Sequence, residues 1–144
     1  MAGKTLMLVE DNVDDIELFK LALTLSNLDS DIVVARDGPD ALALLIGRDN
    51  GPLPDVILLD LKLPRLNGLD VLRAIKGNSR TRAIPVVILT TSGERSDLET
   101  AYEIGCNSYL RKPVDFSQFN EMVRDVHRYW LTLNTAPPTP GDLT

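Results

Sequence analysis

The chain has 144 residues, of which 44% are hydrophobic, so it is long enough for one domain with a substantial core. Its net charge of −6 argues against nucleic acid as the main partner, because a phosphate backbone is bound by a basic surface. The single cysteine, Cys106, excludes an intramolecular disulfide and fits a reducing compartment. The N-terminal apolar run, about five residues long, is too short for a signal peptide or a membrane span. We therefore expect a cytoplasmic protein that does not bind a membrane.

Short apolar runs alternate with helical patterns along the chain. In chain order the expected elements are a strand at 6–9, a helix capped by Asn12 or Asp14, a strand at 31–35, a helix at 41–46, a strand at 56–59, a helix at 67–75, a strand at 86–89, a helix at 94–104, a strand at 107–110 and a helix at 115–133. Gly105 suits the left-handed position that often follows a helix. Five strand–helix pairs in succession are typical of a doubly wound parallel sheet.

Right-handed crossovers leave few topologies for such a sheet. We expect the flavodoxin-like strand order 2-1-3-4-5, because it places the carboxyl ends of the first and third strands side by side. Residues 4–133 would form this α/β domain. Residues 134–144 contain three prolines and no apolar periodicity, so we expect a flexible C-terminal tail there.

Polar residues follow four of the expected strands. Glu10 and Asp11 follow the first strand, Asp60 the third, Thr90 the fourth and Lys112 the fifth. A doubly wound sheet presents its functional groups at the carboxyl ends of its strands, so we expect these side chains to meet at one crevice. The pattern therefore indicates a site for a divalent metal and a phosphoryl group.

Three carboxylates in one crevice repel each other. Two unit charges about 4 Å apart cost roughly 4 kcal/mol at an effective dielectric near 20. Mg²⁺ suits such a cluster, because it takes one or two carboxylates, keeps waters and accepts phosphate oxygens. Asp60 would be the nucleophile that attacks phosphorus and forms an aspartyl phosphate. Lys112 would contact one phosphate oxygen as a point charge, and Thr90 would donate a hydrogen bond to another. Taken alone, the pair Glu10-Asp11 also fits solvated loop acids or helix caps.

This ordered set resembles the receiver domain of response regulators in two-component signalling, over about residues 4–133. The resemblance rests on Glu10-Asp11, Asp60, Thr90 and Lys112-Pro113, with Thr90 lying 30 residues and Lys112 lying 52 residues after Asp60. It implies a stand-alone response regulator whose Asp60 takes a phosphoryl group from a sensor histidine kinase, as in a phosphorelay.

The resemblance also implies roles for individual groups. Mg²⁺ would be bound by Asp11, Asp60 and the backbone carbonyl of Lys62, with Glu10 acting through water. The bond between Lys112 and Pro113 would be cis and would turn the lysine back over the site.

Thr90 and Tyr109 match the switch pair of the receiver family. On phosphorylation the Thr90 hydroxyl would move toward the phosphoryl group, and the space that it leaves would admit Tyr109. The alternative is that Tyr109 is a half-buried aromatic residue of a strand. The surface that responds would be the one formed by the fourth helix, the fifth strand and the fifth helix.

The end of the last expected helix carries a surplus of apolar side chains. Tyr129, Trp130, Leu131 and Leu133 fall on more than one face of the helix. They indicate a partner surface, or alternatively they close the bottom of the core. Receiver domains often pair through the fourth helix, fifth strand and fifth helix, so we expect a homodimer. The segments 10–12 and 129–131 resemble those of single-domain regulators that serve phytochrome-type light-sensing kinases.

Two other functions are compatible with this fold class. A small aspartyl-phosphate phosphatase or phosphotransferase would want a second acid two residues after the nucleophile, where this chain has Lys62. A nucleotide or flavin binder would need a glycine-rich loop after the first strand, where Asn12-Val13-Asp14 stands. We therefore expect a signalling protein that catalyses only its own phosphorylation and dephosphorylation. His127, the single histidine, is expected on the surface of the last helix.

Overall fold

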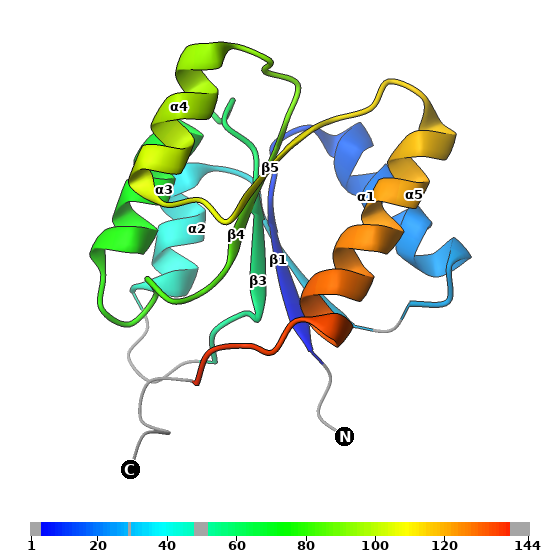
Figure 1. Ribbon diagram of the computed structural model, residues 1–144, viewed down its shortest axis with the longest axis horizontal. Coiled ribbons are helices and arrows are strands. Elements are labelled where there is room, and N and C mark those ends of the chain that lie inside the picture. Colours follow the sequence, from blue (N-terminus) through cyan, green and yellow to red (C-terminus); the bar gives the residue numbers. More distant parts are fainter. Residues whose placement is uncertain (1–3, 29, 48–51, 139–144) are drawn as a thin grey trace.

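The computed structural model describes residues 4–28, 30–47 and 52–138, and it forms a parallel sheet with helices on both faces (Figure 1). The strands are β1 (Thr5–Val9), β2 (Asp31–Ala35), β3 (Val56–Leu59), β4 (Val86–Thr90) and β5 (Ser108–Arg111). The helices are α1 (Val13–Leu25), α2 (Gly38–Leu45), α3 (Gly68–Gly77), α4 (Arg95–Ile104) and α5 (Phe116–Arg128), and a π-helical turn, η1 (Tyr129–Leu133), continues α5. Neighbouring strands are parallel and lie in the order β2-β1-β3-β4-β5, which confirms the predicted flavodoxin-like sheet.

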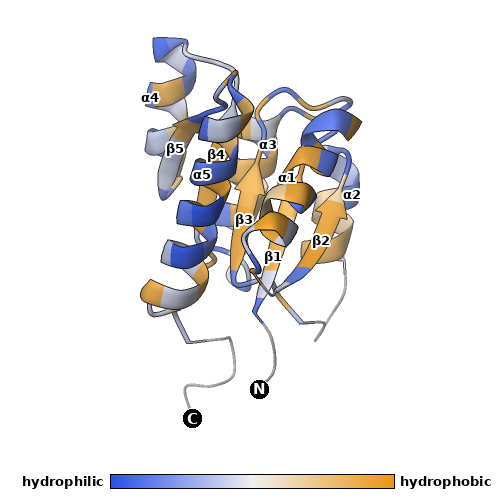
Figure 2. Ribbon diagram, turned by 90° about the vertical axis from the view of Figure 1, so that its right-hand side faces the viewer, coloured by the Kyte–Doolittle hydropathy of each residue, from blue (hydrophilic) through white to orange (hydrophobic). Residues whose placement is uncertain are grey.

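Helices cover both faces of the sheet, with α1 and α5 on one side and α2, α3 and α4 on the other (Figure 1). Alternate residues of a strand point to opposite faces. Met7 and Ile57 accordingly pack in the core beneath α2 to α4, while Leu8 and Leu58 pack in the core beneath α1 and α5. Both faces of β1, β3 and β4 are buried, so these strands are apolar apart from Thr5 at the start of β1 and Thr90 at the end of β4 (Figure 2).

Short polar side chains begin four of the five α-helices. Asn12 accepts a hydrogen bond from the backbone of the first turn of α1, and Asp37, Asn67 and Asp115 do the same for α2, α3 and α5. Asn12, rather than Asp14, is therefore the residue that caps α1. No side chain caps α4 in this way at Glu94.

Two helices differ by more than two residues from their predicted bounds, for local reasons. The second helix begins at Gly38 instead of residue 41, because Asp37 caps it and Pro39 fits a first helical turn, where no N–H is needed. The predicted helix 115–133 is α5 up to Arg128 and then the wider turn η1, in which the Asn134 N–H donates to the Tyr129 carbonyl at 2.6 Å. Gly105 has a φ of 124°, as predicted for the position after α4.

The prediction that His127 lies on the helix surface is wrong. Its side chain is buried, because α5 packs against α1 and places His127 beside the α1–β2 connection, where Nε2 lies 3.0 Å from Ser30 Oγ. Of the predicted flexible tail, residues 139–144 lie outside the described residues, while Ala136 and Pro138 line a small pocket with Leu53 and Pro85. No helix in the described ranges is both long and apolar enough to cross a membrane.

Candidate functional site

The carboxyl ends of the central strands bring the predicted acids together. One carboxylate oxygen from each of Glu10, Asp11 and Asp60 lies within 4.8 Å of the others. Glu10 and Asp60 are buried, whereas Asp11 is exposed. Oxygen donors on the edge of a parallel sheet, with one of them open to solvent, fit a hard divalent cation such as Mg²⁺. The three carboxylates of the predicted donor set are thus brought together in the fold, and the Lys62 carbonyl stays a prediction.

Lys112 reaches into this acidic cluster from the end of β5. Its Nζ lies 2.5 Å from Glu10 Oε1, 2.9 Å from Asp15 Oδ2 and 3.1 Å from Asp60 Oδ2. The Lys112 backbone N–H donates to the Thr90 carbonyl at 2.8 Å, which ties the residue to the end of β4. Lys112 was predicted at this site, but the fourth acid, Asp15, was not.

The bond between Lys112 and Pro113 is trans, and no cis peptide bond occurs among the described residues. The expected cis bond is therefore wrong for this structure. Lys112 does not need a cis bond to meet the acids, because its long side chain reaches them while its backbone continues the pairing with Thr90.

Burial and charge act together on the ionisable groups. Burial raises the pKa of Glu10 to about 7, with a further contribution from the charge of Asp60, while the hydrogen bond from Lys112 acts in the opposite direction. Burial by itself would lower the pKa of Lys112, but hydrogen bonds to Glu10 and Asp15 and the charge of Asp60 raise it above its ordinary value. Lys112 therefore stays charged, and the cluster as a whole favours an added cation.

Asp60 is held in place through both its backbone and its carboxylate. Its N–H donates to the Val9 carbonyl at 3.1 Å, and Oδ1 accepts a hydrogen bond from the Lys62 N–H at 3.2 Å. Gly68, at the start of α3, packs closely against the same backbone. A Cβ atom at this position would lie 2.2 Å from the Asp60 carbonyl oxygen. The space behind Asp60 therefore requires glycine.

Thr90 and Tyr109 meet through a residue that the sequence did not single out, Ser92. The Ser92 N–H donates to Thr90 Oγ1 at 3.3 Å, and Tyr109 Oη donates to the Ser92 carbonyl at 3.0 Å. Tyr109 is partly buried and packs against the core beneath α2 to α4, so it faces inward in this structure. The hydroxyl-rich run 90–92 was visible in the sequence, but the contacts of Ser92 depend on how β5 approaches the β4–α4 loop.

Comparison with known proteins shows which family and which solved structures the chain resembles. The profile of the response regulator receiver domain matches residues 6–124. Response regulator Rcp1 of Synechocystis sp. is 39% identical over 137 residues, which are 93% of this chain and 93% of that protein.

Two solved structures of cyanobacterial regulators resemble the whole chain. The phosphorylated cyanobacterial phytochrome response regulator RcpA has a TM-score of 0.89 at 38% identity, with 95% of this chain and 100% of that chain covered. The Mn²⁺-bound form of Rcp1 has a TM-score of 0.86 at 38% identity, with 94% and 99% covered.

Proposed function

Since this chain belongs to the response regulator receiver domain family, we propose that it is a phosphoacceptor switch in which Asp60 receives a phosphoryl group from a sensor histidine kinase. The observation that carries the proposal is the position of Asp60, whose carboxylate lies beside two other acids and the Lys112 ammonium at the carboxyl edge of the sheet. An Asp60 oxygen would attack phosphorus as the bond between phosphorus and the kinase histidine breaks, and the imidazole would leave with the electron pair.

Lys112 and Thr90 would act on the transferred group. Lys112 would donate to one phosphoryl oxygen, because its Nζ already lies 3.1 Å from Asp60 Oδ2. The Thr90 hydroxyl would donate to another. Mg²⁺, held by Asp11, Asp60 and the Lys62 carbonyl with Glu10 acting through water, would offset the charge of the acids and of the phosphoryl oxygens.

The switch would pass through Ser92. When the Thr90 hydroxyl turns toward the phosphoryl group, Thr90 Oγ1 would give up the hydrogen bond from the Ser92 N–H. Tyr109 Oη donates to the carbonyl of the same residue, so movement of Ser92 would change the position of Tyr109. Tyr109 lies on β5 between α4 and α5, and the surface formed by these three elements is the proposed output face.

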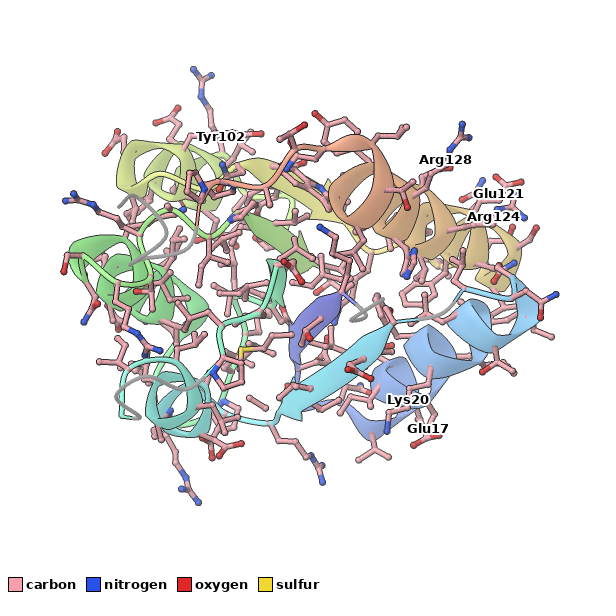
Figure 3. The ribbon with its side chains drawn as sticks, turned by 90° about the horizontal axis from the view of Figure 1, so that it is seen from below. Glu17, Lys20, Tyr102, Glu121, Arg124 and Arg128 are labelled. Atoms are coloured by element: carbon pink, nitrogen blue, oxygen red, sulfur yellow. The ribbon has the colours of Figure 1, made fainter. Side chains whose placement is uncertain are left out.

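This output face would also be the contact between two copies of the chain. Tyr102 on α4 is 52% exposed and Tyr129 at the end of α5 is 49% exposed. Figure 3 shows Tyr102 on the outer side of α4 and Glu121, Arg124 and Arg128 on the outer side of α5. Between β5 and α5 lies a groove of about 590 Å³ whose lining includes Leu110, Met122 and Trp130. Apolar groups surrounded by both charge signs suit a self-complementary interface.

The surplus apolar side chains of η1 divide between the two expected roles. Leu131 is buried, and Trp130 packs partly against the core beneath α1 and α5, so these two close the bottom of the molecule. Tyr129 contacts Trp130 edge to face, with ring centroids 4.9 Å apart, and remains half exposed, as does Leu133. Tyr129 and Leu133 are therefore the most exposed apolar side chains of η1, and a partner could contact them directly.

The kinase would be a phytochrome-type photoreceptor. The support for this partner is that the similar structure of RcpA is described as a phytochrome response regulator. Exposed apolar side chains also border the carboxyl edge: Val13 begins α1, Val114 follows the Lys112-Pro113 pair, and Phe116 begins α5. Such groups around the acceptor suit docking of a protein donor.

The acceptor is tested by incubating the protein with Mg²⁺ and acetyl phosphate and measuring the intact mass. We expect one phosphoryl group per chain in the wild type and none in Asp60→Asn. Asp70→Asn, which changes an exposed acid paired with Arg73, should be labelled like the wild type. An adduct that persists in Asp60→Asn would place the acceptor elsewhere. Sustained hydrolysis of small phosphate esters beyond one turnover would instead favour the phosphatase or phosphotransferase.

A further inference from the structure

Asp15, in the first turn of α1, is a fourth carboxylate beside Lys112. Its Oδ2 lies 2.9 Å from Nζ, and its side chain is 29% exposed while that of Lys112 is 8% exposed. An ammonium group has three N–H donors. The carboxylates of Glu10, Asp15 and Asp60 accept one hydrogen bond each, so all three donors of Lys112 are used.

The turn between β1 and α1, which carries Glu10 and Asp11, also fixes the position of Asp15. The Asn12 N–H donates to Glu10 Oε2 at 3.1 Å, and Asn12 Oδ1 accepts a hydrogen bond from the Asp15 N–H at 3.1 Å. The same asparagine therefore orients Glu10, begins α1 and places Asp15 over Lys112.

Besides contacting Lys112, Glu10 and Asp60 contribute converging oxygens to the candidate cation site, and Asp15 does not. When an Asp60 oxygen is bonded to phosphorus in the acyl phosphate, the carboxylate loses its charge, and the N–H of Lys112 that points to it can pass to a phosphoryl oxygen. We propose that Asp15 is a positioning residue that anchors the Lys112 ammonium throughout this exchange; the inference rests on the proposed function of Asp60.

The test compares Asp15→Asn with Asp14→Asn, a matched loss of one negative charge. Asp14 is the preceding residue, is exposed, and makes no contact with Lys112 in the described structure. At saturating Mg²⁺ and acetyl phosphate, we expect Asp15→Asn to be labelled about tenfold more slowly than the wild type, and Asp14→Asn at the wild-type rate. Asp15→Glu keeps the charge and should recover part of the rate. Thermal melting of each variant checks that it is folded.

A double-variant measurement separates action through Lys112 from a general structural effect. If Asp15 acts by holding Lys112, then Asp15→Asn should cause no further slowing in a Lys112→Gln background. Equal slowing in both backgrounds, or wild-type labelling of Asp15→Asn, would overturn the positioning role. Absence of labelling in both the wild type and Asp14→Asn would instead overturn the proposed function itself, so the two failures are distinguishable.

Discussion

At the scale of single residues, the site combines four acids with one ammonium. The ammonium of Lys112 pairs with three of these acids, Glu10, Asp15 and Asp60. Asp11 lies beside Glu10 and Asp60, so the local charge is negative before a cation binds. Burial raises the pKa of Glu10, which shows that the folded chain resists adding the last negative charge. A divalent cation would relieve this repulsion, and protonation of Glu10 would compete with it.

Asp11 is the acid whose removal should affect the metal most directly. Asp11→Asn should weaken Mg²⁺ binding, because it removes the exposed member of the converging carboxylates. Without metal, the variant should be slightly more stable, by up to about 1 kcal/mol, since solvent screens an exposed charge. Melting curves with and without Mg²⁺ measure both effects through the stabilisation that a bound ligand gives. Equal Mg²⁺ stabilisation of wild type and variant would remove Asp11 from the site.

Gly68 offers a second prediction, because it tests the packing behind the acceptor. In Gly68→Ala the Cβ would lie 2.2 Å from the Asp60 carbonyl oxygen and 2.5 Å from Leu61 Cα, so the backbone must move. We expect a loss of about 1–3 kcal/mol in the free energy of unfolding and slower phosphorylation. Gly77→Ala, at the other end of α3, meets no atom within 4 Å and should raise stability by about 0.5–1 kcal/mol. Urea unfolding of both variants measures the contrast.

His127 should give stability a pH dependence. Burial lowers its pKa below the ordinary value of 6.5, and Nδ1 has no hydrogen-bond partner among the described residues. As pH falls below about 6.5, the unfolded chain therefore takes up a proton before the folded one, and stability is lost. Glu10, whose pKa is raised, contributes in the opposite direction, but it is common to wild type and variant. The free energy of unfolding of the wild type relative to His127→Gln, measured with urea, should therefore fall as pH drops below about 6.5; a difference that stays constant with pH would contradict this.

At the scale of elements, the β4–α4 loop connects the acceptor edge to α4. Ser92 Oγ donates to Asp97 Oδ2 at 2.6 Å and accepts from the Glu94 N–H at 3.3 Å. Because no side chain at Glu94 caps α4, Ser92 takes over part of that task. The residue that links Thr90 to Tyr109 thus also holds the first turn of α4.

Ser92→Ala should therefore loosen the beginning of α4. We expect a loss of about 1 kcal/mol, as for removal of a helix cap, and faster amide hydrogen exchange over residues 94–98. Ser96→Ala changes an exposed serine in the same turn and should leave both quantities close to wild type. Hydrogen exchange read by mass spectrometry gives the result for this segment directly. Unchanged exchange in Ser92→Ala would mean that Asp97 and the loop backbone hold α4 without it.

The elements also show which parts of the molecule could be predicted. The strands were found because helices bury both faces of the sheet, which leaves uninterrupted apolar runs such as Val56–Leu59. The acids of the cluster followed from topology, since strand order places their strand ends side by side. Asp15 was missed because its contact with Lys112 joins residues 97 positions apart, between the β5–α5 connection and the first turn of α1. The burial of His127 was missed for the same kind of reason: it depends on the α1–β2 connection, not on the pattern of α5.

At the scale of the whole molecule, two neighbouring sides carry different proposed contacts. The carboxyl edge of the sheet holds the acceptor and is bordered by Val13, Val114 and Phe116. The α4–β5–α5 face runs along the side of the sheet where β5 is the edge strand (Figure 1). A kinase at the first surface would therefore leave the second free for another copy of the chain. Ser92 and Tyr109 lie between the two, so phosphorylation should alter affinity across the output face.

The final prediction concerns assembly through this face. Sedimentation equilibrium of the wild type at tens of micromolar should show a dimer. Phosphorylation of Asp60 should change the free energy of dimerisation by about 1–3 kcal/mol, the usual size of such a coupling. Tyr129→Ser should weaken the dimer, because Tyr129 is half exposed at the end of α5. Leu21→Ser changes a similarly exposed apolar residue on α1, away from this face, and should dimerise like the wild type. A wild type that stays monomeric with and without phosphorylation would refute the dimer, and the output face would then serve only a kinase or a downstream target.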